Sequence, residues 1–167
     1  MSSFRDIHSK TIESYERVAA WWDSHRSKKL SEECWLRELT LAIPAKGKVL
    51  DAGCGGGSPI AEYFIRHGYK VTGVDGAAAM IELARGRFPQ CRWVQMDMRK
   101  LALGEKFDAI IGWDSFFHLN QAEQRAVLLL FREHLRAGGA LLLTVGHAAG
   151  EVLGEVGGEP VYHSSLS

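Results

Sequence analysis

A glycine-rich segment, Val49-Leu-Asp-Ala-Gly-Cys-Gly-Gly-Gly57, constrains the fold of this chain more than any other feature. It begins in a short apolar strand and runs into Ser58-Pro59, which is typical of a helix start. Glycines between a strand and a helix let the backbone approach a ligand more closely than any Cβ would permit. They also leave N–H groups at the helix start free to bind that ligand. The segment therefore predicts a first strand, a ligand-binding turn and a helix.

Beyond this loop, apolar segments of strand length alternate with amphipathic ones. Further strands are predicted at residues 69–75, 91–95, 107–113 and 140–145, and helices at 58–68, around Met80 and Leu83, and at 120–135. The alternation predicts right-handed βαβ units in a mostly parallel sheet with helices on both faces, an α/β, Rossmann-like three-layer αβα sandwich. The carboxyl ends of its strands meet at one edge, where ligands bind in this architecture.

Composition excludes several classes of partner. The 167 residues suffice for one domain, and 20 Lys plus Arg balance 20 Asp plus Glu, so we expect no nucleic-acid partner. No stretch approaches the ~20 apolar residues of a membrane helix, so we expect no membrane association. Cys34, Cys54 and Cys91 are too widely spaced for a CxxC site. They predict no metal site and a reduced, cytoplasmic location.

The spacing of the glycines separates two kinds of cofactor. A dinucleotide fingerprint is G-x-G-x-x-G, but Ser58 stands at the sixth position here, and the spacing is instead G-x-G-x-G from Gly53. Asp51 lies two residues before the first glycine. A carboxylate there suits a cofactor with an ammonium and a sulfonium, and it would repel a pyrophosphate. The loop resembles motif I of the class I S-adenosylmethionine-dependent methyltransferases.

The resemblance extends in register over residues 11–165. It implies that Asp75, at the end of the second strand, accepts both ribose hydroxyls, and that Asp97, after the third, accepts from the adenine amino group. Each aspartate alone is equally consistent with a solvated loop residue, and Trp113 with core packing. The cofactor-binding residues implied for S-adenosyl-L-methionine are Asp51, Ala52, Gly53, Cys54, Gly55, Gly57, Asp75, Gly76, Met80, Asp97, Met98 and Trp113.

The N-terminal segment predicts a helical cap over residues 1–45, ahead of a cofactor-binding core at 46–146. An amphipathic helix spans about residues 9–26 and carries Tyr15, Trp22 and Arg26. Related small-molecule methyltransferases use such a helix as a lid, which implies that Tyr15 or Arg26 reaches the cofactor carboxylate. A helix packed on the sheet edge, with Arg26 in water, explains the pattern equally well.

The loop after the fourth strand is where the family lines its acceptor pocket. It reads Trp113-Asp-Ser-Phe-Phe-His-Leu119, without the prolines found there in nucleic-acid and glutamine amino-methyltransferases. A small-molecule acceptor, or a modest protein target, is therefore expected rather than a nucleic-acid base. Methyl transfer is an in-line displacement that depends mainly on alignment, and a base is needed only if the acceptor must lose a proton. His118 is the first candidate base and Asp114 the second; a capping or packing role for His118 remains open.

Two other functions stay open. A non-catalytic S-adenosylmethionine-binding or regulatory protein would keep the glycine loop without the acceptor pocket. A nicotinamide-dependent oxidoreductase would share the fold, but Ser58 and the second acidic site at Asp97 argue against it.

The C-terminal residues lead to a separate expectation. The resemblance implies seven strands, with the last two forming a hairpin beside the fifth. Only residues 159–163 look like a strand here, so we expect a core in the order 3-2-1-4-5, a missing hairpin and a flexible, truncated tail at 147–167. The fifth strand, Leu141–Val145, would then be an exposed apolar edge, which predicts a homodimer or tail exchange there.

Overall fold

The structure is a computed structural model that describes residues 3–166. Its helices are α1 (Phe4–Ser9), α2 (Thr11–His25), α3 (Glu33–Ala42), α4 (Ile60–Arg66), α5 (Ala78–Arg87) and α6 (Gln121–His134), with short 3-10 turns η1 (Met98–Lys100) and η2 (Phe116–His118). Its strands are β1 (Lys48–Ala52), β2 (Lys70–Asp75), β3 (Arg92–Gln95), β4 (Phe107–Gly112), β5 (Leu135–Leu143), β6 (Gly150–Val156) and β7 (Glu159–Ser165).

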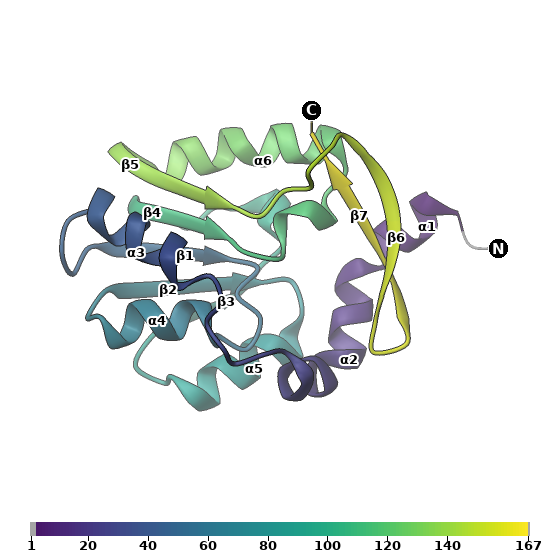
Figure 1. Ribbon diagram of the computed structural model, residues 1–167, viewed down its shortest axis with the longest axis horizontal. Helices are drawn as coiled ribbons and strands as arrows, with labels where there is room; N and C mark the ends of the chain where they lie inside the picture. Colours follow the sequence, from purple (N-terminus) through teal and green to yellow (C-terminus); the bar gives the residue numbers. More distant parts are fainter. Residues whose placement is uncertain (1–2, 167) are drawn as a thin grey trace.

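The main sheet has five parallel strands in the order β3-β2-β1-β4-β5, which confirms the predicted order (Figure 1). Asp51 pairs in register with Gly73 and Asp75 with Gln95, so the carboxyl ends of β1, β2 and β3 lie along one edge. This is the edge of the sheet at which the sequence predicted a ligand to bind.

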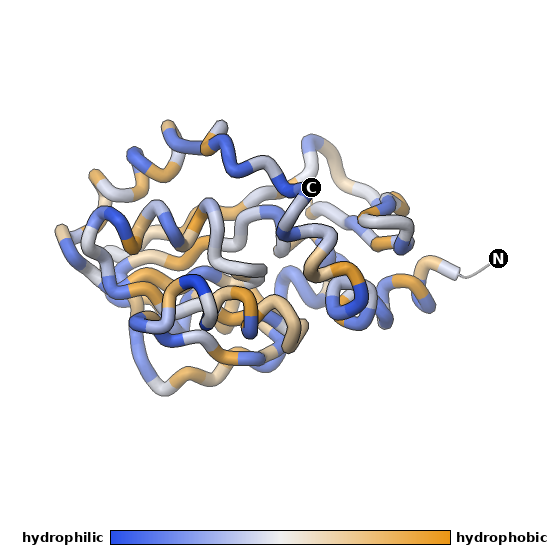
Figure 2. The backbone as a smooth tube through the Cα atoms, turned by 90° about the horizontal axis from the view of Figure 1, so that it is seen from below, coloured by the Kyte–Doolittle hydropathy of each residue, from blue (hydrophilic) through white to orange (hydrophobic). Residues whose placement is uncertain are grey.

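Helices cover both faces of this sheet, as predicted. Leu36 of α3, Phe64 of α4 and Ile81 of α5 pack on one face, and Val127 and Phe131 of α6 pack on the other. β1 and β4 between them are almost wholly buried. Figure 2 shows this pattern along the backbone, with apolar colours in the central strands and hydrophilic segments mostly on the outer helices and loops. The two apolar cores fix the positions of the strand ends that carry the site.

The fifth strand begins earlier than predicted. The sequence indicated a helix through Leu135 and a turn before a strand at Ala140, but α6 ends at His134 and β5 starts at once. Gly138, with φ of 76°, lies in an irregular stretch of the β4–β5 pairing. The Arg136 guanidinium donates to both carboxylate oxygens of Asp108 in β4, at 2.7 and 2.8 Å. This ion pair helps to hold the early part of β5 against β4.

The expectation of a missing C-terminal hairpin is wrong. β6 and β7 form an antiparallel hairpin in which Gly150 pairs with Ser165 and Val156 with Glu159. Gly157 and Gly158 make the turn, both with positive φ, a conformation that glycine adopts without strain. The hairpin is a separate two-stranded sheet and does not lie beside β5.

The hairpin instead packs against the N-terminal helices (Figure 1). Val156 and Val161 form a small apolar cluster with Val18 of α2, which explains why these residues order as strands. α2 matches the predicted helix, whereas α1, capped by reciprocal hydrogen bonds between Ser3 and Asp6, was not predicted. No helix within residues 3–166 has the length and apolar character needed to cross a membrane.

Candidate functional site

A cavity lies at the carboxyl ends of the strands, between the glycine loop, the loop after β4 and the helices α1 and α2. Of the residues predicted for the site, those that line this cavity are Tyr15, Arg26, Asp51, Gly53, Cys54, Gly55, Asp75, Gly76, Met80, Asp97, Met98, Trp113, Asp114 and His118. The exceptions are Ala52 and Gly57. Ala52 is buried in β1, and a Cβ on Gly57 would meet the Trp93 ring at 3.0 Å. Both residues therefore pack against the core rather than facing the cavity.

The glycine loop is folded so tightly that Gly53 cannot carry a side chain. Its φ is 82°, and a Cβ there would lie 2.2 Å from the Cβ of Ser115. The N–H groups of Gly53 and Cys54 both donate to the carbonyl oxygen of Val74, at 2.8 and 3.0 Å. The loop is thereby tied to the end of β2, and its backbone faces the cavity.

Asp75 is fixed by backbone groups on both sides. Its Oδ2 accepts from the N–H of Gly55 and its Oδ1 from the N–H of Ala77, each at 2.9 Å. Burial raises the pKa of this carboxyl, while the two N–H donors partly oppose that shift. The carboxylate has lone pairs left for further donors, and a vicinal diol supplies two of them.

Asp51 is the most unusual charge in the site. The residue is 2% exposed, and no group in residues 3–166 donates a hydrogen bond to its side chain. Burial raises the pKa of Asp51 to about 7, although the positive charge of Arg26 opposes the shift. A buried carboxylate that lines a cavity without a donor is costly to the fold and well suited to a cationic ligand.

Asp97 is held by Arg99 rather than free. The Arg99 guanidinium donates from Nε to both carboxylate oxygens at 2.9 and 2.8 Å, and the Arg99 backbone N–H donates at 2.9 Å. Burial alone would raise the pKa of Asp97, but these bonds outweigh it and hold the pKa below its usual range. Asp97 is therefore ionised and fixed at the end of β3.

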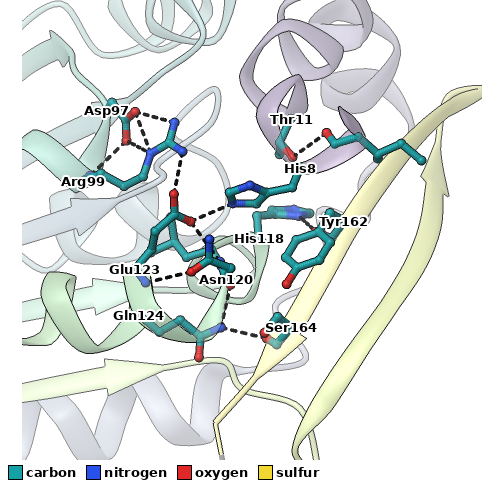
Figure 3. Close-up of polar contacts among 12 residues, drawn as sticks. His8, Thr11, Asp97, Arg99, His118, Asn120, Glu123, Gln124, Tyr162 and Ser164 are labelled. Carbon is teal, nitrogen blue, oxygen red and sulfur yellow. Dashed lines mark hydrogen bonds and ion pairs between the residues drawn. The ribbon is translucent and has the colours of Figure 1, made fainter. Parts of the chain in front are cut away.

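His118 joins the N-terminal helix to the hairpin. Its Nδ1 lies 2.8 Å from the carbonyl oxygen of Tyr162, which can only accept, so Nδ1 carries the proton (Figure 3). Its Nε2 therefore accepts from the hydroxyl of Tyr15 at 2.9 Å. Burial lowers the pKa of His118 to about 4, so the ring is neutral near pH 7. The structure thus shows the histidine both packed and hydrogen-bonded beside the cavity.

Arg26 and Asp114, which both line the cavity, form an ion pair. The guanidinium donates to the Asp114 carboxylate at 3.1 Å and to Glu32 at 3.5 Å, and it lies over the Trp22 ring. Asp114 adopts φ of 50°, and its N–H donates to the Thr144 hydroxyl. Arg26 is therefore not in bulk water: it closes the cavity beside the glycine loop.

Sequence reasoning missed several cavity residues, among them His8, Ile12, Arg99 and Ser115. The helical spacing of Ile12 with Tyr15, Trp22 and Arg26 was a signal that could have placed Ile12 on the same helix face. The Gly157-Gly158 pair was likewise a signal for the turn of a hairpin. Arg99 and Ser115 act through contacts that no local pattern reveals.

Comparison with known proteins agrees with this geometry. The profile of the family described as "Methyltransferase domain" matches residues 49–139. The chain is 30% identical over 165 residues to a ubiquinone biosynthesis O-methyltransferase of Cereibacter sphaeroides, covering 85% of this chain and 65% of that protein. It is 32% identical over 102 residues to a dTDP-3-amino-3,4,6-trideoxy-α-D-glucopyranose N,N-dimethyltransferase of Streptomyces venezuelae, covering 60% of this chain and 43% of the relative.

A solved structure gives the same result. S-adenosylmethionine-bound CalS10, an amino pentose methyltransferase from Micromonospora echinaspora, superposes with a TM-score of 0.63 at 28% identity, covering 90% of this chain and 69% of CalS10. The chain spans 65% and 43% of the lengths of the two curated relatives named above, less than two thirds in each case. Because the family profile covers the glycine loop, the strand-end acids and β4 together, this chain belongs to the methyltransferase-domain family, among the class I proteins that use S-adenosylmethionine.

Proposed function

We propose that this protein transfers a methyl group from S-adenosylmethionine to a small-molecule acceptor. The observation that carries the proposal is Asp51, a buried carboxylate that lines the cavity and has no donor among residues 3–166. An ammonium or sulfonium group would complete it, whereas the phosphates of a nicotinamide dinucleotide would be repelled. The proposal is tested by titrating the purified chain with S-adenosylhomocysteine.

The residues of the cavity fit this cofactor in order along the sheet edge. Asp51, Arg26 and the glycine loop would hold the amino-acid end of the cofactor. Asp75 would accept from the ribose hydroxyls, and Asp97 would accept from the adenine amino group. Met80, Met98 and Trp113 supply apolar wall. When bound, S-adenosylmethionine supplies a methyl group activated on a sulfonium. The chain's own part is to align that group with the acceptor and to exclude water.

The acceptor would lie at the end of the cavity where α2, η2 and β7 meet. There the Tyr15 hydroxyl donates to His118 Nε2, and the Tyr162 carbonyl fixes the tautomer. The neutral His118 can take a proton from an acceptor hydroxyl or amine through Tyr15, whose hydroxyl passes its own proton to Nε2 as it receives the acceptor's, and Asp114 is the second candidate base. The two curated relatives described above carry the names of an O-methyltransferase and an N-methyltransferase. An acceptor with a hydroxyl or amino group, and no nucleic acid, is therefore part of the proposal.

Substitution of His118 tests this role. His118→Asn retains a donor for the Tyr162 carbonyl but removes the basic nitrogen, so kcat with an accepted substrate should fall about 100-fold. The dissociation constant for S-adenosylhomocysteine, measured by calorimetry, should change less than about twofold. His25→Asn, on the exposed side of α2, is the matched control. Loss of cofactor binding in His118→Asn would assign the residue to the cofactor instead.

The proposal includes a homodimer through the β5 edge and a cytoplasmic location. β5 is the outer strand of the main sheet, and Leu141 on it is 39% exposed. Such an edge invites pairing with a second copy. Cys34, Cys54 and Cys91 are free thiols, which suits a reducing compartment. Sedimentation at micromolar concentration should show a dimer that Leu141→Lys dissociates; a monomeric unmodified chain would exclude the dimer.

A further inference from the structure

Arg99 contacts the carboxylate proposed to read the cofactor's base, and nothing in the proposed mechanism has yet used it. It follows Asp97 by two residues, in η1 at the end of β3. Its Nε donates to both carboxylate oxygens of Asp97, and its Nη2 lies 2.6 Å from Asp97 Oδ2, so the guanidinium binds the carboxylate in a bidentate way. A planar, bidentate pair fixes orientation as well as charge.

Arg99 is in turn held from the opposite side. Its Nη1 donates to Glu123 Oε1 at 3.0 Å, and the other oxygen of Glu123 lies 2.7 Å from Nε2 of His8 in α1 (Figure 3). The same oxygen accepts the N–H of Asn120, which caps α6. Glu123 is therefore anchored at a helix start and does not depend on Arg99 for its position. The four side chains form one polar chain from α1 to the end of β3.

The partners of this chain come from distant parts of the sequence. Glu123 follows Arg99 by 24 residues and His8 precedes Glu123 by 115. The side chains of Asp97, Arg99 and Glu123 are 21%, 31% and 24% exposed, so the network is partly shielded from water. Partial burial strengthens these charge-assisted bonds relative to those on an open surface. A fixed geometry at Asp97 is the expected result.

We infer that Arg99 is a positioning residue for recognition of the cofactor's base: it orients the Asp97 carboxylate as an acceptor for the exocyclic amino group of adenine. The inference rests on the proposed cofactor site. An ionised carboxylate accepts only, so it pairs with the amino group of adenine and repels the oxo group that hypoxanthine carries at the same ring position. Arg99 acts through Asp97 and determines how strongly the site distinguishes the two bases.

The test compares S-adenosylhomocysteine with its deaminated form, S-inosylhomocysteine, which carries an oxo group in place of the amino group and a proton on the neighbouring ring nitrogen, N1. The unmodified chain should bind the adenosine form at least about tenfold more tightly. Arg99→Met should weaken binding of the adenosine form about tenfold and of the inosine form less than about twofold, so that the preference shrinks. Arg99→Lys, which retains the charge without the bidentate geometry, should give an intermediate preference and serves if Arg99→Met folds poorly.

The control is Arg92→Met, which removes a guanidinium from the opposite end of β3, where Arg92 pairs with Glu105 and not with Asp97. It should leave the preference unchanged. If the Arg99 variants keep the full preference, or lose affinity for both ligands equally, Arg99 has only a structural role and the inference is wrong. If the unmodified chain binds both forms equally well, the inference fails while the proposed function stands. If it binds neither, both fail together.

Discussion

Asp51→Asn should make the fold more stable at pH 8 while greatly weakening cofactor binding. The folded chain holds the Asp51 carboxyl at a pKa of about 7, against 3.8 in the unfolded chain. Between these values the folded chain binds a proton that the unfolded chain has released, so the free energy of unfolding falls as pH rises from about 4 to 7. Above pH 7 the full cost remains, on the order of a few kcal/mol.

Asparagine removes that charge but still buries a polar amide. We therefore expect Asp51→Asn to raise the free energy of unfolding at pH 8 by about 1–2 kcal/mol and to change it little at pH 5, as measured by urea denaturation. Affinity for S-adenosylhomocysteine should fall at least about tenfold, because the ammonium loses its counter-charge. Glu38→Gln, which removes an exposed acid in α3, is a control for net charge. If Asp51→Asn is no more stable than the unmodified chain at pH 8, burial of the Asp51 charge does not destabilise the fold.

Asp75→Ala should weaken binding of S-adenosylhomocysteine by about 1–3 kcal/mol, roughly 5- to 150-fold. The substitution removes the charged acceptor proposed for two ribose hydroxyls and also leaves the N–H groups of Gly55 and Ala77 without their partner. Asp75→Asn retains one acceptor oxygen and should lose less. Calorimetry measures both affinities, and a thermal melt of each variant shows whether the fold persists. A folded Asp75→Ala chain that binds within twofold of the unmodified one would exclude the ribose role.

The sequence predicted the parts of the site that parallel strands bring together. Asp51, Asp75 and Asp97 each follow an apolar segment, and strands in register place such residues at one edge without further information. The tight turn at Gly53 was also predictable, because four glycines in five residues are rarely needed for anything but close backbone approach.

Other parts depended on packing between distant segments. The Tyr15–His118 hydrogen bond joins residues 103 apart, and sequence reasoning assigned each residue a separate role without linking them. Arg99 looked like an ordinary charged residue after a strand, and only its position between Asp97 and Glu123 distinguishes it. The hairpin was missed because β6 is rich in Gly and Glu and only Val156 in it is buried. Its apolar contact is a small cluster with Val18 of α2, so few buried positions mark it as a strand.

The most direct measurement is a calorimetric titration of the unmodified chain with S-adenosylhomocysteine and, separately, with NADH. The proposed site predicts saturable, one-to-one binding of S-adenosylhomocysteine, because Asp51, Asp75 and Asp97 would accept from its ammonium, ribose hydroxyls and adenine amino group. It predicts no comparable binding of NADH, because the buried Asp51 carboxylate would face a pyrophosphate. Tight binding of NADH without detectable binding of S-adenosylhomocysteine would contradict the proposed function.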